Sequence, residues 1–176
     1  MRQQSFLKQL GYTLDRSHGG QATLGKRKVR RPLDPRYPLH LVLRASCAKK
    51  NLSLLRPANR DTIYRILTTK AKKFHVNLDG YANVGNHLHL KLRFKKRENF
   101  QKFLKSITSL IARHVTGARK GRPFGKFWDH LAFTKVIRVW RQEKQLDRYI
   151  VANAVEAYFG PIARTRFLQN TRANSS

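Results

Sequence analysis

Residues 85–94, GNHLHLKLRF, alternate apolar and polar side chains without interruption. Successive side chains of a β-strand point to opposite faces of a sheet, so Leu88, Leu90 and Leu92 are predicted to share one face. The opposite face is predicted to carry His87, His89, Lys91 and Arg93. A strand of this kind is stable only when its apolar face is covered, so the segment predicts a sheet with helices packed on the leucine side.

Periodicity along the rest of the chain predicts three further strands and three helices. Alternation predicts strands within 37–46, within 75–83 before the VGN break, and near 130–139. Apolar residues at steps of three and four predict helices over 58–74, 97–115 and 141–159, with Asn59 as the N-cap of the first. The order βαββαβα predicts an α+β fold with a ferredoxin-like or RRM-like four-stranded antiparallel sheet. We expect its helices on one face, which leaves the other face for a ligand.

The charge of the chain predicts a polyanionic partner. Lysine and arginine number 38 against 9 acidic residues, a formal net charge of +29 at pH 7. Nucleic acid fits this charge better than a membrane surface, because the basic residues are spread along the whole chain rather than gathered on one amphipathic helix. With no long apolar run and no secretory signal, we expect a cytoplasmic, nucleoid-associated protein. The single cysteine, Cys47, excludes an internal disulfide.

The two ends of the chain differ in composition from its middle. Residues 1–36 contain glycines, prolines and five basic residues among the six of 26–31, so we expect a flexible basic arm there. Residues 37–160 are predicted to form a single domain, and residues 161–176 a polar C-terminal tail.

The histidine pair has two interpretations. In a strand, His87 and His89 lie about 7 Å apart on one face, from where two imidazoles can bind one metal ion. An arbitrary pair of this kind is more often an ordinary polar part of a solvated surface.

Two residues of the last predicted helix are possible partners of the histidine pair. Tyr149 and Asn153 lie four residues apart and therefore on one helical face, where a phenol and an amide oxygen can reach a common site. For Tyr149 too there is a simpler interpretation, a tyrosine at the boundary of helix and sheet.

Taken together, these motifs resemble a known family. GNHLHLKL resembles the His-hydrophobic-His strand of the HUH single-strand endonucleases, and RYIVANAVEA is similar to the tyrosine helix of their single-tyrosine transposase branch. The segments YPLHLVLR and GKFWDHLAF and the order of elements support the likeness. Over residues 36–160 the chain is thus similar to the REP-associated tyrosine transposases, which act on repetitive extragenic palindromes.

The resemblance implies a specific chemistry. It implies that His87 and His89 hold one Mg²⁺ or Mn²⁺, with Asn153 completing or supporting the metal shell. It also implies that Tyr149 attacks a phosphate of single-stranded, hairpin-bearing DNA, which leaves a 5′-phosphotyrosine and a free 3′-hydroxyl. The active unit is expected to be a monomer or a homodimer.

The sequence departs from the family pattern in two places. Val84-Gly85 replaces the usual Met-Pro before the first histidine, and Asn153-Ala154 replaces the usual Asn-Pro after the tyrosine. The second change is expected to straighten the helix and to shift Asn153 relative to the metal. His40 and His130 can also approach the site, although the resemblance assigns them no role.

Basic residues near these motifs are the candidate phosphate contacts. The candidates are Lys91, Arg93, Lys95, Lys96 and Arg97, and in the arm Lys26, Arg27, Lys28, Arg30 and Arg31. Any one of them is also explained as a solvated surface charge.

Two other functions remain open from the sequence. A non-catalytic nucleic-acid-binding module is one, because a four-stranded sheet with a basic open face is also how RNA-recognition domains bind, although their stacking aromatic residues are missing here. A basic ribosome-associated protein is the other.

Overall fold

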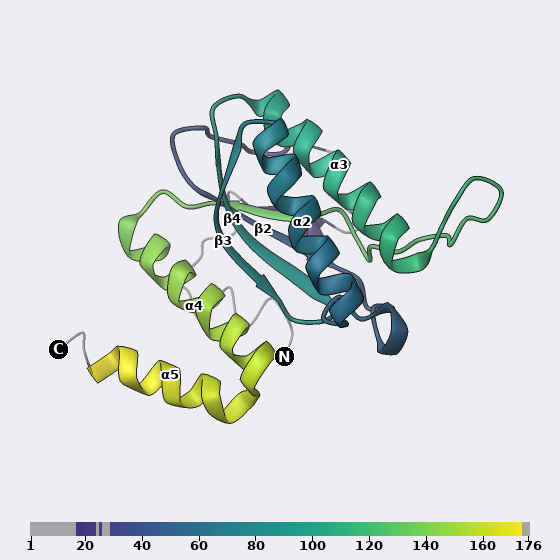
Figure 1. The fold of residues 1–176 in the computed structure, drawn as a ribbon. Coiled ribbons are helices and arrows are strands. Elements are labelled where there is room, and N and C mark those ends of the chain that lie inside the picture. Colours follow the sequence, from purple (N-terminus) through teal and green to yellow (C-terminus); the bar gives the residue numbers. More distant parts are fainter. Residues whose placement is uncertain (1–16, 24, 26–28, 174–176) are drawn as a thin grey trace.

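The computed structural model describes residues 17–23, 25 and 29–173, which form an α+β fold with four α-helices and a five-stranded sheet (Figure 1). The strands are β1 (Ser17–His18), β2 (Leu39–Arg44), β3 (Val76–Asn83), β4 (His87–Phe94) and β5 (Phe133–Val136). The helices are α2 (Pro57–Lys73), α3 (Arg97–Thr116), α4 (Trp140–Phe159) and α5 (Pro161–Ala173), with short 3-10 turns at Gly20–Thr23 and Lys50–Leu52. No helix in this part of the chain is both long and apolar enough to cross a membrane.

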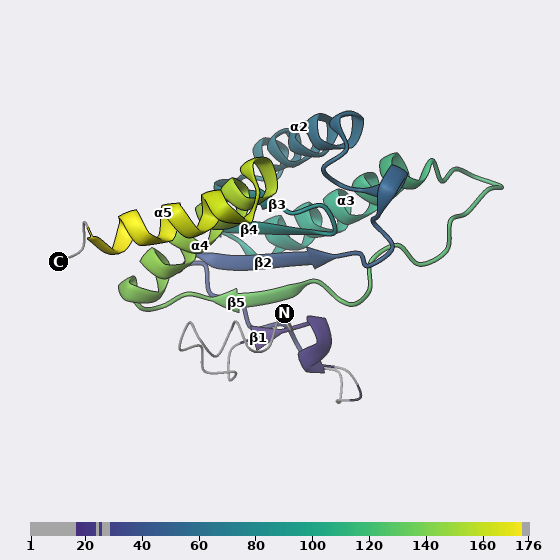
Figure 2. The ribbon, with the colours of Figure 1, turned by 90° about the horizontal axis from the view of Figure 1, so that it is seen from below.

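All neighbouring strands of the sheet are antiparallel, in the order β1-β5-β2-β4-β3 (Figure 2). Our prediction of four strands is wrong by one, because β1 pairs with the outer edge of β5. This short strand covers backbone groups that an edge strand would otherwise leave unpaired. Two residues in a glycine-rich segment carry no periodic signal, which is why the sequence did not reveal β1.

The leucine face of the sheet carries the larger core, as the alternation predicted. Leu88, Leu90 and Leu92 are each 0% exposed. Helices α2 and α3 pack on them through Ile63, Leu67, Phe100, Phe103, Ile107 and Ile111. This packing fixes β4 in register, since a slip by one residue would move all three leucines to the other face.

The second face of the sheet is partly covered, contrary to our expectation of helices on one face only. Figure 1 shows α2 and α3 on one side of the sheet and α4 on the other. Leu146 and Ile150 of α4 pack on an apolar patch made by Val42, Ala82 and Phe133. The patch was not predicted because its three residues come from three strands other than β4 and form no pattern along the chain.

Two further expectations differ from the structure at the ends of elements. Residues 161–173, which we expected to belong to a polar tail, form α5, and α5 is joined to α4 by an ion pair between Glu156 and Arg164. Asn59 is not an N-cap, because α2 begins at Pro57 and the Asn59 amide instead donates to the Ser53 carbonyl at 2.8 Å.

Candidate active site beneath helix α4

His87 and His89 lie on the face of β4 that is opposite the leucines, and their ring centroids are 4.8 Å apart. The Nδ1 atom of His87 is 2.6 Å from the Asn86 Oδ1 atom. Because an amide oxygen can only accept a hydrogen bond, His87 carries its proton on Nδ1 in this arrangement. Its Nε2 atom therefore keeps a free lone pair, which is the form in which an imidazole binds a metal ion.

His89 is the middle member of a buried chain of three polar side chains. Its Nε2 atom lies 3.3 Å from the Tyr149 hydroxyl oxygen, and its Nδ1 atom lies 3.3 Å from the His40 Nε2 atom. His40 is 1% exposed and His89 is 3% exposed. The His89 ring is stacked on His40 and meets the ring of Tyr149 edge-on. The strand pairing explains the chain, since His40 lies on β2 beside β4 and on the same face of the sheet.

Burial controls the protonation of these groups. It lowers the pKa of His40 to about 3 and the pKa of His87 to about 4, and it also places the pKa of His89 well below 6.5. All three imidazoles are therefore neutral at pH 7. Burial raises the pKa of Tyr149, although a hydrogen bond with Asn153 and the charge of Arg164 act in the opposite direction. Tyr149 is therefore a neutral phenol at pH 7.

Asn153 lies one turn after Tyr149 on α4 and is buried. Its Nδ2 atom donates to the Tyr149 carbonyl oxygen at 2.7 Å. The structure thus brings His87 against His89, His89 against Tyr149, and Asn153 against Tyr149. Among the described residues, no group of three or more His, Cys, Asp or Glu side chains could hold a metal, so any metal here would need donors beyond the His87–His89 pair, and the Asn153 amide is the one that the sequence suggests. Neutral imidazoles and an amide oxygen fit a divalent cation that also takes oxygen ligands from a substrate.

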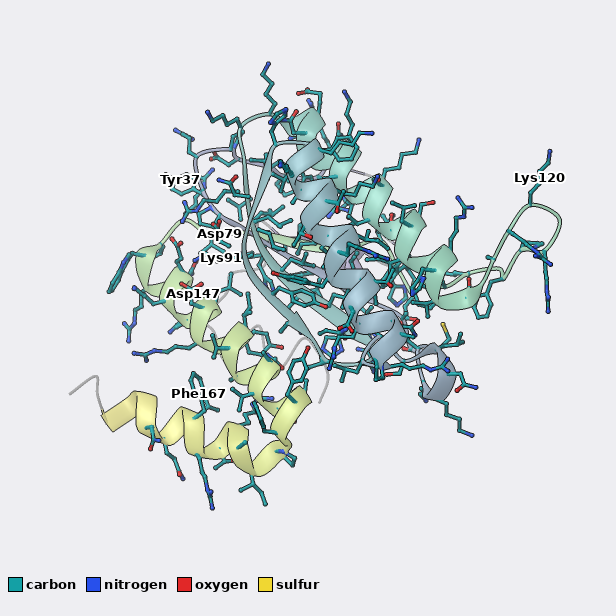
Figure 3. The ribbon with its side chains drawn as sticks, viewed as in Figure 1. Tyr37, Asp79, Lys91, Lys120, Asp147 and Phe167 are labelled. Atoms are coloured by element: carbon teal, nitrogen blue, oxygen red, sulfur yellow. The ribbon has the colours of Figure 1, made fainter. Side chains whose placement is uncertain are left out.

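Lys91 does not lie where a DNA contact would, which corrects our expectation for it. It is 6% exposed, and its Nζ atom lies 2.7 Å from Asp147 Oδ1 and 2.8 Å from Glu143 Oε1. Figure 3 shows Lys91 and Asp147 facing each other between the sheet and α4. Burial lowers the pKa of Lys91, but hydrogen bonds to the two carboxylates outweigh this, so the pKa is raised and the ammonium stays charged.

Arg93 also binds acidic side chains rather than projecting freely. It bonds Asp79 of β3 at 2.8 Å and Glu143 of α4 at 2.5 Å, with its side chain 43% exposed. The two basic residues that follow the histidines on β4 are thus part of the interface between α4 and the sheet.

The other predicted phosphate contacts lie at two different places. Lys95 and Lys96 are exposed on a groove of about 680 Å³ at the end of β4, which Lys72 and His75 also line. Arg97 is half-buried and donates to the Arg31 carbonyl oxygen at 3.1 Å. A basic groove suits a phosphate backbone, so Lys95 and Lys96 stay predicted contacts.

The described part of the N-terminal arm is attached to the sheet. Arg31 donates to the Ala132 carbonyl at 2.7 Å and to Thr134 Oγ1 at 2.6 Å, and burial lowers its pKa to about 10. These bonds hold Arg31 in place, which does not fit a free arm that reaches for DNA. Arg30 is exposed. Lys26, Arg27 and Lys28 lie outside the described residues.

A second hollow lies next to the histidine pair. Arg44 of β2 is paired with His87 across the strands, and it lines a hollow of about 370 Å³ together with Ser46, Lys126, Asp129 and His130. His130, which we considered as a possible neighbour of the site, is thus on the wall of this hollow. Arg44 and Lys126 bring positive charge to the hollow, and Asp129, which lies 3.5 Å from Arg44, offsets part of it.

Sequence reasoning missed the partners that surround the site. His40 was noted only as a residue able to approach it, although its place on the polar face of the first predicted strand was a usable signal. Glu143 and Asp147 were not singled out. Their spacing of four residues on the last helix, in a chain with 9 acidic residues, was the signal that could have identified them.

Comparisons with known proteins give structural similarity only. No family model matches the chain, and no curated protein matches its sequence. The solved structure of a REP-associated tyrosine transposase bound to a REP hairpin is similar with a TM-score of 0.55, at 12% sequence identity over 76% of this chain and 75% of that one. A candidate transposase from Deinococcus radiodurans R1 is similar with a TM-score of 0.43, at 18% identity over 72% of this chain and 97% of that one. The first of these similarities shows that the two chains share a fold.

Proposed function

We propose that this protein is a tyrosine transposase that cuts and rejoins single-stranded, hairpin-bearing DNA. The observation that carries the proposal is the contact between a phenol and a histidine pair: Tyr149 Oη lies 3.3 Å from His89 Nε2, with His87 beside it. These are the residues that the motif resemblance selects as nucleophile and metal ligands. The fold shared with a hairpin-bound transposase supports the proposal, and we take β5-β2-β4-β3 to be the expected ferredoxin-like core.

The proposed reaction transfers one DNA phosphate from a 3′ oxygen to the hydroxyl oxygen of Tyr149. Tyr149 Oη bonds the phosphorus, the bond from phosphorus to the 3′ oxygen breaks, the phenol gives up its proton and the 3′ oxygen takes one up. The product is a 5′-phosphotyrosine and a free 3′-hydroxyl, and attack by a 3′-hydroxyl reverses the step. His87, His89 and Asn153 would hold Mg²⁺ or Mn²⁺, a cation that polarises a phosphate and stabilises its developing charge when bound.

The residues of the chain prepare this step in three ways. Packing of α4 on the sheet holds the phenol above β4. Burial keeps the imidazoles neutral and hence able to act as ligands. The positive charge of Arg164 of α5 partly offsets the burial that raises the pKa of Tyr149, and so reduces the cost of forming the phenolate that attacks.

The alternative of an RNA-recognition module is less well supported. Such a module binds bases on the open face of its sheet. In this protein α4 packs on that face over β3 and β4, where its Leu146 and Ile150 meet Ala82. Part of the face on which such a module would stack bases is therefore covered by the helix that carries Tyr149.

The proposal is tested by trapping the covalent product. Wild type and Tyr149→Phe are incubated with Mn²⁺ and a pool of single-stranded oligonucleotides that carry a hairpin with randomised flanks and a 3′ label. We expect a labelled protein band on a denaturing gel for wild type and none for Tyr149→Phe. With a 5′ label the same reaction should release a shorter free strand. A wild type that forms no adduct, or a Tyr149→Phe variant that forms as much, overturns the proposal.

A further inference from the structure

Helix α4 runs antiparallel to β4, so later residues of the helix contact earlier residues of the strand. Glu143 bonds Arg93 and Lys91, Asp147 bonds Lys91, and Tyr149 meets His89. The ion pairs and the candidate active site are therefore neighbouring parts of one interface. We define the ionic clamp as Lys91 with Glu143 and Asp147.

Apolar packing alone does not explain the register of α4. The helix buries Leu146 and Ile150 on the patch of Val42, Ala82 and Phe133. Contacts of this kind are non-directional and tolerate sliding and rotation of a helix on a sheet. Charge-assisted hydrogen bonds are directional, so they define position more closely than apolar contacts.

The ionic clamp has the geometry of a specific lock. The Lys91 ammonium is 2.7 Å and 3.0 Å from the two carboxylate oxygens of Asp147, and 2.8 Å from Glu143 Oε1. It is nearly inaccessible to solvent, where an unpaired charge would be strongly unfavourable. Any movement of α4 that separates these atoms is therefore opposed.

The clamp is next to the candidate site along both elements. Lys91 is two residues from His89 on the same face of β4, and Asp147 is two residues before Tyr149 on α4. A shift of α4 by one residue would move Tyr149 by about 1.5 Å along the helix and rotate it by about 100°. Either change would separate the phenol from His89.

We propose that Lys91 is a positioning residue for Tyr149: through Glu143 and Asp147 it fixes the register of α4 on β4 and so places the phenol oxygen beside His89. This inference rests on the proposed function for its catalytic meaning, while the position of the phenol is measurable without catalysis. The clamp also gives a reason why a chain so poor in acidic residues places two of them within reach of Lys91 on this helix.

The test uses a double variant, Glu143→Gln with Asp147→Asn, and a matched control, Asp79→Asn. The control removes a carboxylate that bonds Arg93 in the same neighbourhood but lies on β3, not on α4. For each protein we would measure the rate of adduct formation at saturating hairpin DNA, the DNA dissociation constant and thermal stability. The double variant should form adduct about 10- to 100-fold more slowly, because misplacement of a reacting group by about 1 Å has an effect of this size.

The outcome separates positioning from general stability. Affinity for DNA should change less than about threefold in the double variant, since the Lys91 ammonium at the centre of the clamp is buried, and the control should react at the wild-type rate. Lys91→Met should lose activity, and Lys91→Arg should recover part of it by keeping the charge. A double variant that is folded and reacts within about twofold of wild type overturns the proposal, as does a control that loses as much activity.

A second measurement does not depend on catalysis. With 3-fluorotyrosine at position 149, the metal-free wild type should give one sharp ¹⁹F resonance, and the double variant should give a broadened or additional one. If wild type forms no adduct, the proposed function fails and the ¹⁹F spectra decide the positioning role alone. Identical spectra for wild type and the double variant contradict it.

Discussion

Replacing His40 with leucine should make the protein less sensitive to acid. His40 is buried at 1% exposure on β2, and burial lowers its pKa from 6.5 to about 3. The unfolded chain therefore binds a proton at His40 between these two pH values, and the folded protein does not. By linkage, stability that is present above pH 6.5 is lost as the pH falls below it.

The size of this effect follows from the shift. Keeping one imidazole neutral at about pH 5.5, against an unfolded pKa of 6.5, lowers the free energy of unfolding by about 1.4 kcal/mol. At about pH 7.5 the buried neutral imidazole of His40 lowers the free energy of unfolding by less than about 0.1 kcal/mol. Wild type should therefore lose about 1.4 kcal/mol more than His40→Leu between the two pH values.

The assay is urea unfolding followed by circular dichroism, for both proteins at both pH values and with a chelator present. Comparing the change with pH in the two proteins removes the contributions of groups that titrate equally in both. His87 and His89 should make wild type and variant alike less stable in acid, because burial lowers their pKa as well. If the stability difference between the two proteins is the same at both pH values, the reasoning about His40 is wrong.

Two further predictions concern the core and the charge. Leu90→Ala, at a position that is 0% exposed between β4 and the helices, should lower the free energy of unfolding by about 2–5 kcal/mol in the same urea assay, and a loss below about 1 kcal/mol would contradict the packing described. Raising salt from about 50 to about 200 mM should weaken the binding of a single-stranded oligonucleotide by orders of magnitude in fluorescence anisotropy, and a flat response would count against a polyanionic partner.

The strands and helices of the core were predictable because local patterns decide them. The alternation in 85–94 identified β4 and its buried leucines, and the three- and four-residue periodicity of 97–115 identified α3 to within one residue at its C-terminal end. The helix now called α5 was missed, because its polar composition carries little amphipathic signal and it begins at Pro161, directly after Gly160. The strand β1 was missed because two residues are too few to show a period.

The sequence selected candidate residues for the site but not the contacts between them. In the structure His89 contacts His87 and Tyr149, Asn153 bonds the Tyr149 carbonyl, and the roles of all four stay predictions. The roles of Lys91 and Arg93 were not predictable from alternation, which places a side chain on a face but does not tell what covers that face. A charged residue on an open face would meet solvent or DNA, whereas under α4 it needs a carboxylate.

The sequence by itself determined the faces of the sheet, the residues of the histidine pair and a charge that calls for a polyanion, because periodicity and composition are properties of the chain alone. Only the tertiary structure decided that α4 crosses to the face opposite α2 and α3, because an apolar patch assembled from three strands exists only once they are paired. That crossing buries Lys91 and brings Tyr149 to His89, which the pairing of β2 with β4 places beside His40.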